Sequence, residues 1–160
     1  MASATVSGIS TNGTLLSYAV EGTTAGVKPA SFTKLNRINS IDEISIESEQ
    51  IDSSALEDEI EKNIAGRASA GGSFNIVVNL TNETLTEWET LISASKTATA
   101  AGKATWFQIK PKNLTKAIFV TAEPPAKVPS PAFDQNGLLT VSIPLVINEY
   151  KGYDTLVTAS

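Results

Sequence analysis

The alternation of apolar and polar positions predicts a mainly β chain. Between residues 72 and 80 every second position is apolar, as in a strand with one buried face. The apolar positions there are Phe74, Ile76, Val78 and Leu80, and the polar ones opposite include Ser73, Asn75 and Asn79. Similar patterns predict strands over residues 13–20, 104–110, 116–122 and 138–147.

One segment changes to the 3.6-residue period of a helix. Thr84 and Glu87 have the spacing of a capping box, and Gly102 ends the element. The residues that share its apolar face are Leu85, Trp88, Ile92 and Ser95. Strands, one helix and then more strands are typical of an α+β, mainly β, single domain over residues 1–160. We expect an antiparallel β-sandwich or barrel with one packed α-helix and a long inter-strand loop.

The stretch between the first and the central strands is less regular. Ile44 and Ile46 alternate with Ser45, Glu47 and Glu49, which predicts a strand whose isoleucines face the core and whose polar residues face away. Further on, Leu56, Ile60 and Ile64 recur at a spacing of four. With the Ser54–Glu57 capping box and Gly66, this spacing allows a short helix over residues 55–65, with an apolar face one residue wide.

Composition excludes several classes of chemistry. The chain of 160 residues has no Cys and no His, so it lacks disulfides, Cys/His zinc sites and His-dependent catalytic arrangements. A net charge of -5 with only two arginines argues against electrostatic binding to nucleic acids or membranes. The apolar runs are also far too short to cross a bilayer, so no membrane partner is expected.

The acidic residues are unevenly placed. Nine of the seventeen lie in residues 42–61, where there is no Lys or Arg. A calcium loop starting at Asp52 would need Gly at its sixth position, where Glu57 stands. A two-carboxylate hydrolase remains open, although the few aromatic residues offer little platform for a sugar. A solvated acidic face is the simplest interpretation.

Two other features are interpreted structurally. Residues 123–131 hold four prolines and predict a stiff loop inside the domain. Trp106 and Phe107 are neighbours in a strand, so one ring should point inward and the other outward. The outward ring is either an exposed apolar side chain or an interface anchor.

The order of these segments resembles the major tail tube proteins of long-tailed bacteriophages, which are related to contractile-tail and type VI secretion tubes. The resemblance covers about residues 13–150. It includes GTLLSYAV, the Ile- and Glu-rich strand leading into Ile51-Asp52-Ser53, and the acidic loop after it. The Gly66-Arg67 stretch of small residues, the next strand and helix, and WFQIKP complete it.

That resemblance implies a structural virion protein rather than an enzyme. Such proteins form rings, usually hexameric, that stack into a tube, and each subunit gives strands to a ring-shaped β-barrel. The implied partners are other copies of the chain, the tape measure protein, and the tail terminator and distal tail proteins. Double-stranded DNA passes through the bore without specific binding. The implied location is the phage tail, assembled in the host cytoplasm, and no cofactor is expected.

The resemblance also assigns roles to segments. The N-terminal residues 1–12, the loop 50–71 and the C-terminal residues 148–160 are expected to be arms that reach neighbouring subunits. Because carboxylates repel phosphates, we expect Ser45, Glu47 and Glu49 to face the lumen. The residues expected at the inter-subunit loop are Asp52, Leu56, Ile60, Ile64 and Arg67. A monomeric β-sandwich binding module is the main alternative, and a carboxylate-based hydrolase is the other.

Overall fold

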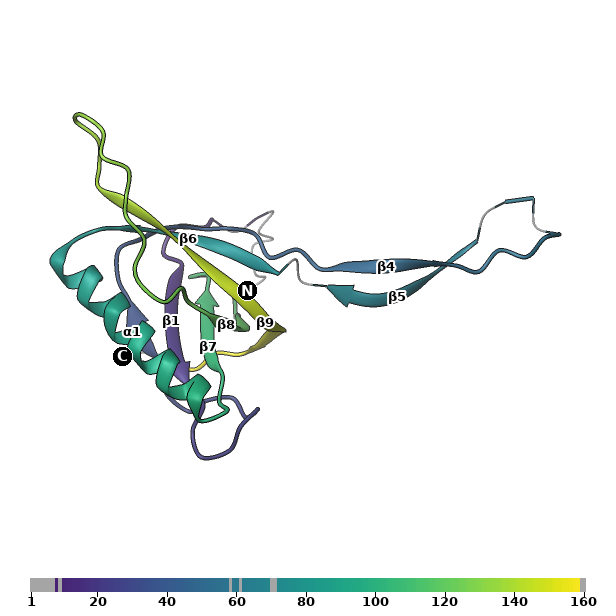
Figure 1. The fold of residues 1–160 in the computed structure, drawn as a ribbon, viewed down its shortest axis with the longest axis horizontal. Coiled ribbons are helices and arrows are strands. Elements are labelled where there is room, and N and C mark those ends of the chain that lie inside the picture. The colour runs from purple at the N-terminus through teal and green to yellow at the C-terminus, as the bar shows by residue number, and fades with distance from the viewer. Residues whose placement is uncertain (1–7, 9, 58, 61, 70–71, 159–160) are drawn as a thin grey trace, which may run out of the picture.

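The chain folds into a curled antiparallel sheet, a long helix and a projecting two-stranded arm (Figure 1). The computed structural model describes residues 8, 10–57, 59–60, 62–69 and 72–158, so most of the expected N-terminal arm and part of the expected loop lie outside the described residues. Its elements are β1 (Leu15–Val20), β2 (Thr33–Leu35), β3 (Ile38–Ile41), β4 (Glu47–Asp52), β5 (Asn63–Ser69), β6 (Ser73–Asn79), α1 (Asn82–Ala100), β7 (Thr105–Lys110), β8 (Lys116–Glu123) and β9 (Thr140–Thr155).

The main sheet has seven strands in the order β2-β1-β7-β8-β9-β6-β3. The five strands predicted from alternation correspond to β1, β6, β7, β8 and β9, which confirms the mainly β class. β9 is longer than predicted, because residues up to Thr155 pair with β8. Residues 148–155, expected in a C-terminal arm, therefore belong to the sheet. Two register shifts in the β8–β9 pairing interrupt the alternation there and hide the strand in the sequence.

The sheet curls because its two edge strands are neighbours in the chain. β2 and β3 lie at opposite edges, yet only Asn36 and Arg37 separate them. Arg37 has a φ of 58°, a left-handed conformation that helps the chain turn here. Glu87 of α1 accepts hydrogen bonds from the backbone N–H and the side-chain amide of Asn36 at 3.1 and 2.6 Å. Among the described strands, β2 and β3 do not pair with each other. The expected barrel is therefore a curled sheet that does not close.

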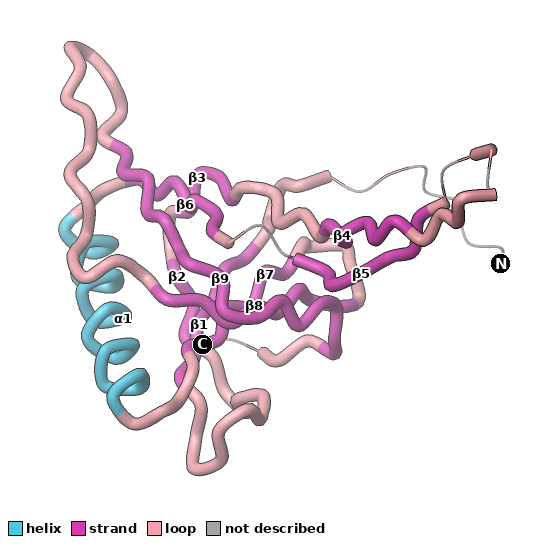
Figure 2. The backbone as a smooth tube through the Cα atoms, turned by 45° about the vertical axis from the view of Figure 1, so that its right-hand side comes forward, coloured by secondary structure: helices cyan, strands magenta, loops and turns pink. Residues whose placement is uncertain are grey.

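Residues 38–79 form one long hairpin with two parts. At its base β3 pairs with β6, with Ile41 opposite Ile76, inside the main sheet. Beyond the base β4 pairs with β5, with Asp52 opposite Asn63, and this part leaves the body as an arm (Figures 1 and 2). The arm is therefore a continuation of two strands that are anchored in the core.

The predicted helix over residues 55–65 is wrong. Residues from Asn63 onward form β5 instead, and a turn occupies Leu56 and Glu57. Of the three apolar residues spaced by four, Ile64 lies in β5 and pairs with Ile51 of β4, whereas Leu56 lies in a turn and Ile60 in a bend outside both strands. The spacing alone therefore does not establish a helix. The strand expected around Ile44 is also shifted: Ile44 packs against the core, whereas Ile46 is 56% exposed rather than facing the core.

Both faces of the sheet are covered around β1, β7 and β8. The main core lies on one face, where α1 contributes Trp88 and Leu91. The helix begins earlier than predicted because Thr81 caps it, accepting from the backbone N–H of Thr84 at 3.2 Å. On the opposite face, Trp106 and Phe119 pack with Phe32 from the loop before β2. Trp106 and Phe107 therefore lie on opposite faces, as expected, but Trp106 is neither exposed nor an interface anchor, because the chain's own loop buries it.

Glu21 holds that loop in place. Its carboxylate is 6% exposed and accepts from the backbone N–H of Ala104 at 2.6 Å and from Trp106 Nε1 at 3.1 Å. It also accepts from the backbone N–H of Gly26. Burial alone would raise the pKa of Glu21, but these three hydrogen bonds and the charge of Lys151 lower it.

We expect Glu21→Gln to destabilise the protein by about 2 kcal/mol at neutral pH, because the amide presents a donor to groups that also donate. A carboxyl whose folded pKa is lowered contributes stability above its unfolded pKa, and this is lost as pH falls through the folded value. The gap between wild type and Glu21→Gln should therefore shrink in acid. Urea denaturation from pH 7 to pH 3 measures it, with exposed Glu123→Gln as the control. A gap independent of pH would contradict the role of the carboxylate.

Candidate assembly interface

The β4–β5 arm has apolar side chains that no described part of the chain covers. β4 pairs only with β5 among the described strands, and all six residues of β4 are exposed. The exposed apolar residues of the arm and its base are Ile46, Ile51, Leu56, Ile60 and Ile64. Leu56 and Ile60 near the tip are 106% and 78% exposed. An isolated two-stranded ribbon is at best marginally stable in water, so this surface is suited to a partner.

Pairing organises the arm's apolar residues. Ile51 lies directly opposite Ile64, so the two side chains share one face of the ribbon. Gly66 keeps the strands close there, since a Cβ at this position would lie 3.1 Å from Ile51 Cδ1. Sequence reasoning singled out Ile64 but missed Ile51, because only the register of the two strands shows that they form a pair.

The neck of the tip is fixed by polar contacts. Ser53 N–H donates to the carbonyl of Lys62 at 2.8 Å, and Lys62 N–H donates to Ser54 Oγ at 2.7 Å. Asp52 accepts from the backbone N–H of Ser54 at 2.9 Å. Hydrogen bonds from the backbone and side chain of Ser54 lower the pKa of Asp52. The carboxylate of Asp52 therefore stabilises a turn.

The structure disperses the residues that could have formed a metal site or a catalytic pair. Among the described residues, no group of three or more acidic side chains could hold a metal ion. Ser45 precedes β4, Glu47, Glu49 and Asp52 lie within it, and Ile64 and Arg67 lie in β5. The residues predicted for these roles thus follow one another along the arm rather than converging on a pocket.

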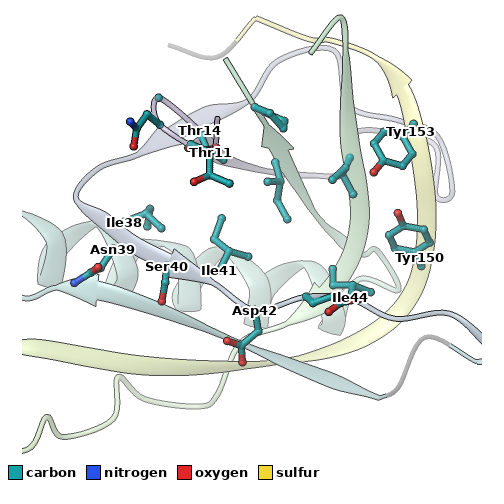
Figure 3. A pocket seen from close by; sticks show the side chains of 16 residues that line it. Thr11, Thr14, Ile38, Asn39, Ser40, Ile41, Asp42, Ile44, Tyr150 and Tyr153 are labelled. Carbon is teal, nitrogen blue, oxygen red and sulfur yellow. Dashed lines mark hydrogen bonds between the residues drawn. The ribbon is translucent and has the colours of Figure 1, made fainter. Parts of the chain in front are cut away.

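A cavity of about 740 Å³ opens beside the base of the arm (Figure 3). It lies between β3 and the end of the sheet where β1 and β8 begin and β7 ends. Ile38 and Ile41 point into it from β3, and Tyr150 and Tyr153 of β9 stand across from them. Burial and the nearby Tyr153 raise the pKa of Tyr150. We call this space the seam cavity.

A second projection lies on the far side of the body from the arm (Figure 1). It is the proline-rich loop between β8 and β9, where Phe133 and Leu138 are 78% and 70% exposed. The backbone N–H of Leu80 donates to the carbonyl of Leu139 at 2.9 Å and ties the loop's end to the sheet. The sequence predicted a stiff loop here but gave no signal that its apolar side chains would be exposed.

Comparisons with known proteins place the fold. No protein-family model matches the chain, and no curated protein matches it. Among the described residues, no helix is long and apolar enough to span a membrane. A chain in the tail of an empty GTA particle, computed with helical refinement in C6 symmetry, matches with a TM-score of 0.55 and 14% identity. That match covers 92% of this chain and 99% of the other.

A chain from the sixfold-symmetrised baseplate of the anti-feeding prophage (AFP) matches as well. Its TM-score is 0.50 at 13% identity, and the match covers 98% of this chain and 97% of that one. Both neighbours are matched over nearly their whole length. The fold implied by the sequence resemblance is confirmed: the chain has the fold of these tail and baseplate components.

Proposed function

We propose that this protein is a structural tail-tube subunit that associates with copies of itself into stacked, hexameric rings. The observation that carries the proposal is the arm, whose apolar residues are left exposed by the part of the chain that the structure describes. The fold supports it, because similar chains occur in a tail computed in C6 symmetry and in a sixfold-symmetrised baseplate.

The free sheet edges give a second reason to expect assembly. β2 pairs only with β1, and β3 only with β6, so each leaves one edge without a strand among those described. Unpaired edges readily accept strands from other copies. A ring would cover both edges at once, because a head-to-tail contact that closes leaves no free end. The expected ring-shaped β-barrel would arise in this way between subunits.

The lumen is proposed to be acidic. Ser45, Glu47 and Glu49 are all exposed and lie at the start of the arm, with no core packing to bury them. Carboxylates on the wall of a channel repel DNA phosphates within about 8 Å at physiological salt. A channel with this charge would let double-stranded DNA pass without holding it.

The remaining roles follow from this assignment. Within a tail the partners would be neighbouring copies, the tape measure protein inside the tube, and terminator and distal tail proteins at its ends. The protein would act in the virion tail after assembly in the host cytoplasm. Its role would be structural, with no catalytic step.

Negative-stain microscopy with light-scattering mass measurement tests the proposal on the purified chain. Rings or tubes are the expected result. A monomer at every concentration would favour a β-sandwich binding module instead. Hydrolysis of a glycoside that is lost on a single Asp or Glu substitution would favour a carboxylate-based hydrolase.

Removing the arm should separate folding from assembly. We expect a variant in which a short Gly-Ser linker joins Ile46 to Gly72 to remain a folded monomer, because β4 and β5 pair with no strand of the main sheet. Circular dichroism should show cooperative unfolding, and microscopy should show no tubes.

Leu56→Ser combined with Ile60→Ser should also weaken assembly. Val27→Ser, at an exposed apolar residue of another loop, is the control and should not. Tubes formed by the armless variant would contradict the proposal.

Charge reversal tests the lumen. In assembled tubes, Glu47→Lys with Glu49→Lys should retain short DNA duplexes, because a basic wall attracts phosphates in a salt-dependent manner. Sedimentation of tubes with labelled duplex from 50 to 300 mM salt measures retention. Glu83→Lys with Glu89→Lys, which places the same charges on exposed positions of α1, is the matched control. Equal retention by both variants, or loss of assembly only in the first, would contradict a lumen position.

A further inference from the structure

Part of the wall of the seam cavity is aliphatic and can pack against apolar side chains. Its walls include Ile38 and Ile41 of β3, Ile109 of β7 and Ile118 of β8. Ile38, Ile41 and Ile118 are only partly buried, although they pack against the main core. The cavity is therefore an opening into the core that the described part of the chain leaves unfilled. At about 740 Å³ it has the size of a typical ligand pocket and can accommodate several aliphatic side chains.

Three lysines lie next to one border of the cavity, although none of them is among the residues that line it. Lys112 lies in the β7–β8 turn, between Lys110 at the end of β7 and Lys116 at the start of β8, and Pro111 of the same turn belongs to the cavity wall. The stem of Lys112 packs against Gly13, another wall residue. On the other border Asp42 accepts from the backbone N–H of Asn75 at 3.2 Å and points away from the cavity (Figure 3). Glu43 is the remaining acid of the wall.

The arm's tip has the complementary character. Leu56 and Ile60 are the most exposed apolar residues of the arm, and Glu57 and Glu59 lie between them. Insertion of the tip into the seam cavity would bury aliphatic side chains against aliphatic walls. It would also bring two carboxylates close to the lysine-bearing turn.

The tip cannot reach the cavity of its own chain. Asp42 and Glu43, where the arm leaves the body, themselves line the cavity. From Ile46 to Leu56 the chain advances ten residues, which spans roughly 33 Å when extended at about 3.3 Å per residue. Both views show the arm pointing away from the sheet (Figures 1 and 2). An arm tip that fills this cavity must therefore belong to another molecule.

We propose that the arm tip of one copy docks in the seam cavity of a second copy, with Leu56 and Ile60 inserted and Glu57 and Glu59 facing Lys112 and Lys116. This inference rests on the proposed self-assembly and specifies which two surfaces meet. The contact is head-to-tail, because the tip and the cavity are different surfaces.

Engineered cysteines test the pairing, since the chain has no native cysteine. Leu56→Cys and Tyr153→Cys proteins, mixed and oxidised, should form a mixed disulfide dimer. Leu56→Cys mixed with Thr99→Cys, an exposed position on α1, is the matched control and should lose that product. A mixed dimer from Phe133→Cys and Tyr153→Cys would instead assign the proline-rich loop as occupant. An intramolecular disulfide in Ser7→Cys with Tyr153→Cys would assign the N-terminal segment; either result overturns the proposal.

Charge reversal provides an independent readout. Replacing Lys110, Lys112 and Lys116 together by Glu should abolish sedimentable tubes while leaving the melting transition cooperative. Replacing Lys96, Lys103 and Lys127 by Glu changes the net charge equally on other surfaces and should retain tubes. Adding Glu57→Lys with Glu59→Lys to the first variant should restore assembly.

The outcomes separate the two proposals. If the wild-type chain forms tubes, but the Leu56→Cys and Tyr153→Cys proteins give no mixed dimer and tubes survive charge reversal at the three lysines, the docking inference is overturned and the tail-tube function stands. If the wild-type chain forms no tubes and the two cysteine variants give no mixed dimer, both proposals are overturned.

Discussion

The structure depends on one hairpin, formed by residues 38–79, whose outer part extends beyond the body of the sheet. Its base, β3 with β6, is anchored because Ile76 and Val78 are completely buried in the core. Its outer part, β4 with β5, has the same antiparallel pairing but no core beneath it. The burial of isoleucines follows this division: Ile38, Ile41 and Ile44 pack against the core, whereas Ile46 and Ile51 are exposed. The arm is thus anchored at its base by the buried residues of β6, although the residues of β4 are themselves exposed.

The same hairpin shapes the rest of the sheet. β3, the first strand of the hairpin, follows β2 after two residues, so the sheet must curl until its two edges are close. Glu87 of α1 holds the connection between β2 and β3 by accepting a hydrogen bond from Asn36. The curl creates an interior for α1 to cover, but β3 leaves the seam cavity beside the ends of β7 and β8. The exposed arm, whose apolar side chains no described residue covers, and the open seam cavity are therefore two consequences of the same chain path.

Sequence patterns predicted the elements that pack directly on the core. The alternation in β6 and the 3.6-residue period in α1 are clear because each element buries one face against the same cluster. The helix expected from Leu56, Ile60 and Ile64 does not form because all three side chains are exposed, so no core packing stabilises a helical face there. The seam cavity, the Ile51–Ile64 pair and the contacts of Glu21 join residues distant in the sequence, so no local pattern contains them.

The placement of charge limits the kinds of assembly that this shape allows. The segment that contains the arm's tip is strongly acidic, since residues 42–61 hold nine acidic residues and no Lys or Arg, so two arms meeting tip to tip would oppose like charges. Like charges opposed at close range disfavour that contact, and a symmetric dimer through the arms is therefore disfavoured. The exposed isoleucines must find a different surface, less acidic than the arm itself. Contacts between unlike surfaces propagate into closed rings or open filaments rather than stopping at pairs. The acidic residues that oppose contact between two arms thus favour the head-to-tail contact proposed above, in which an arm meets a different surface of its neighbour.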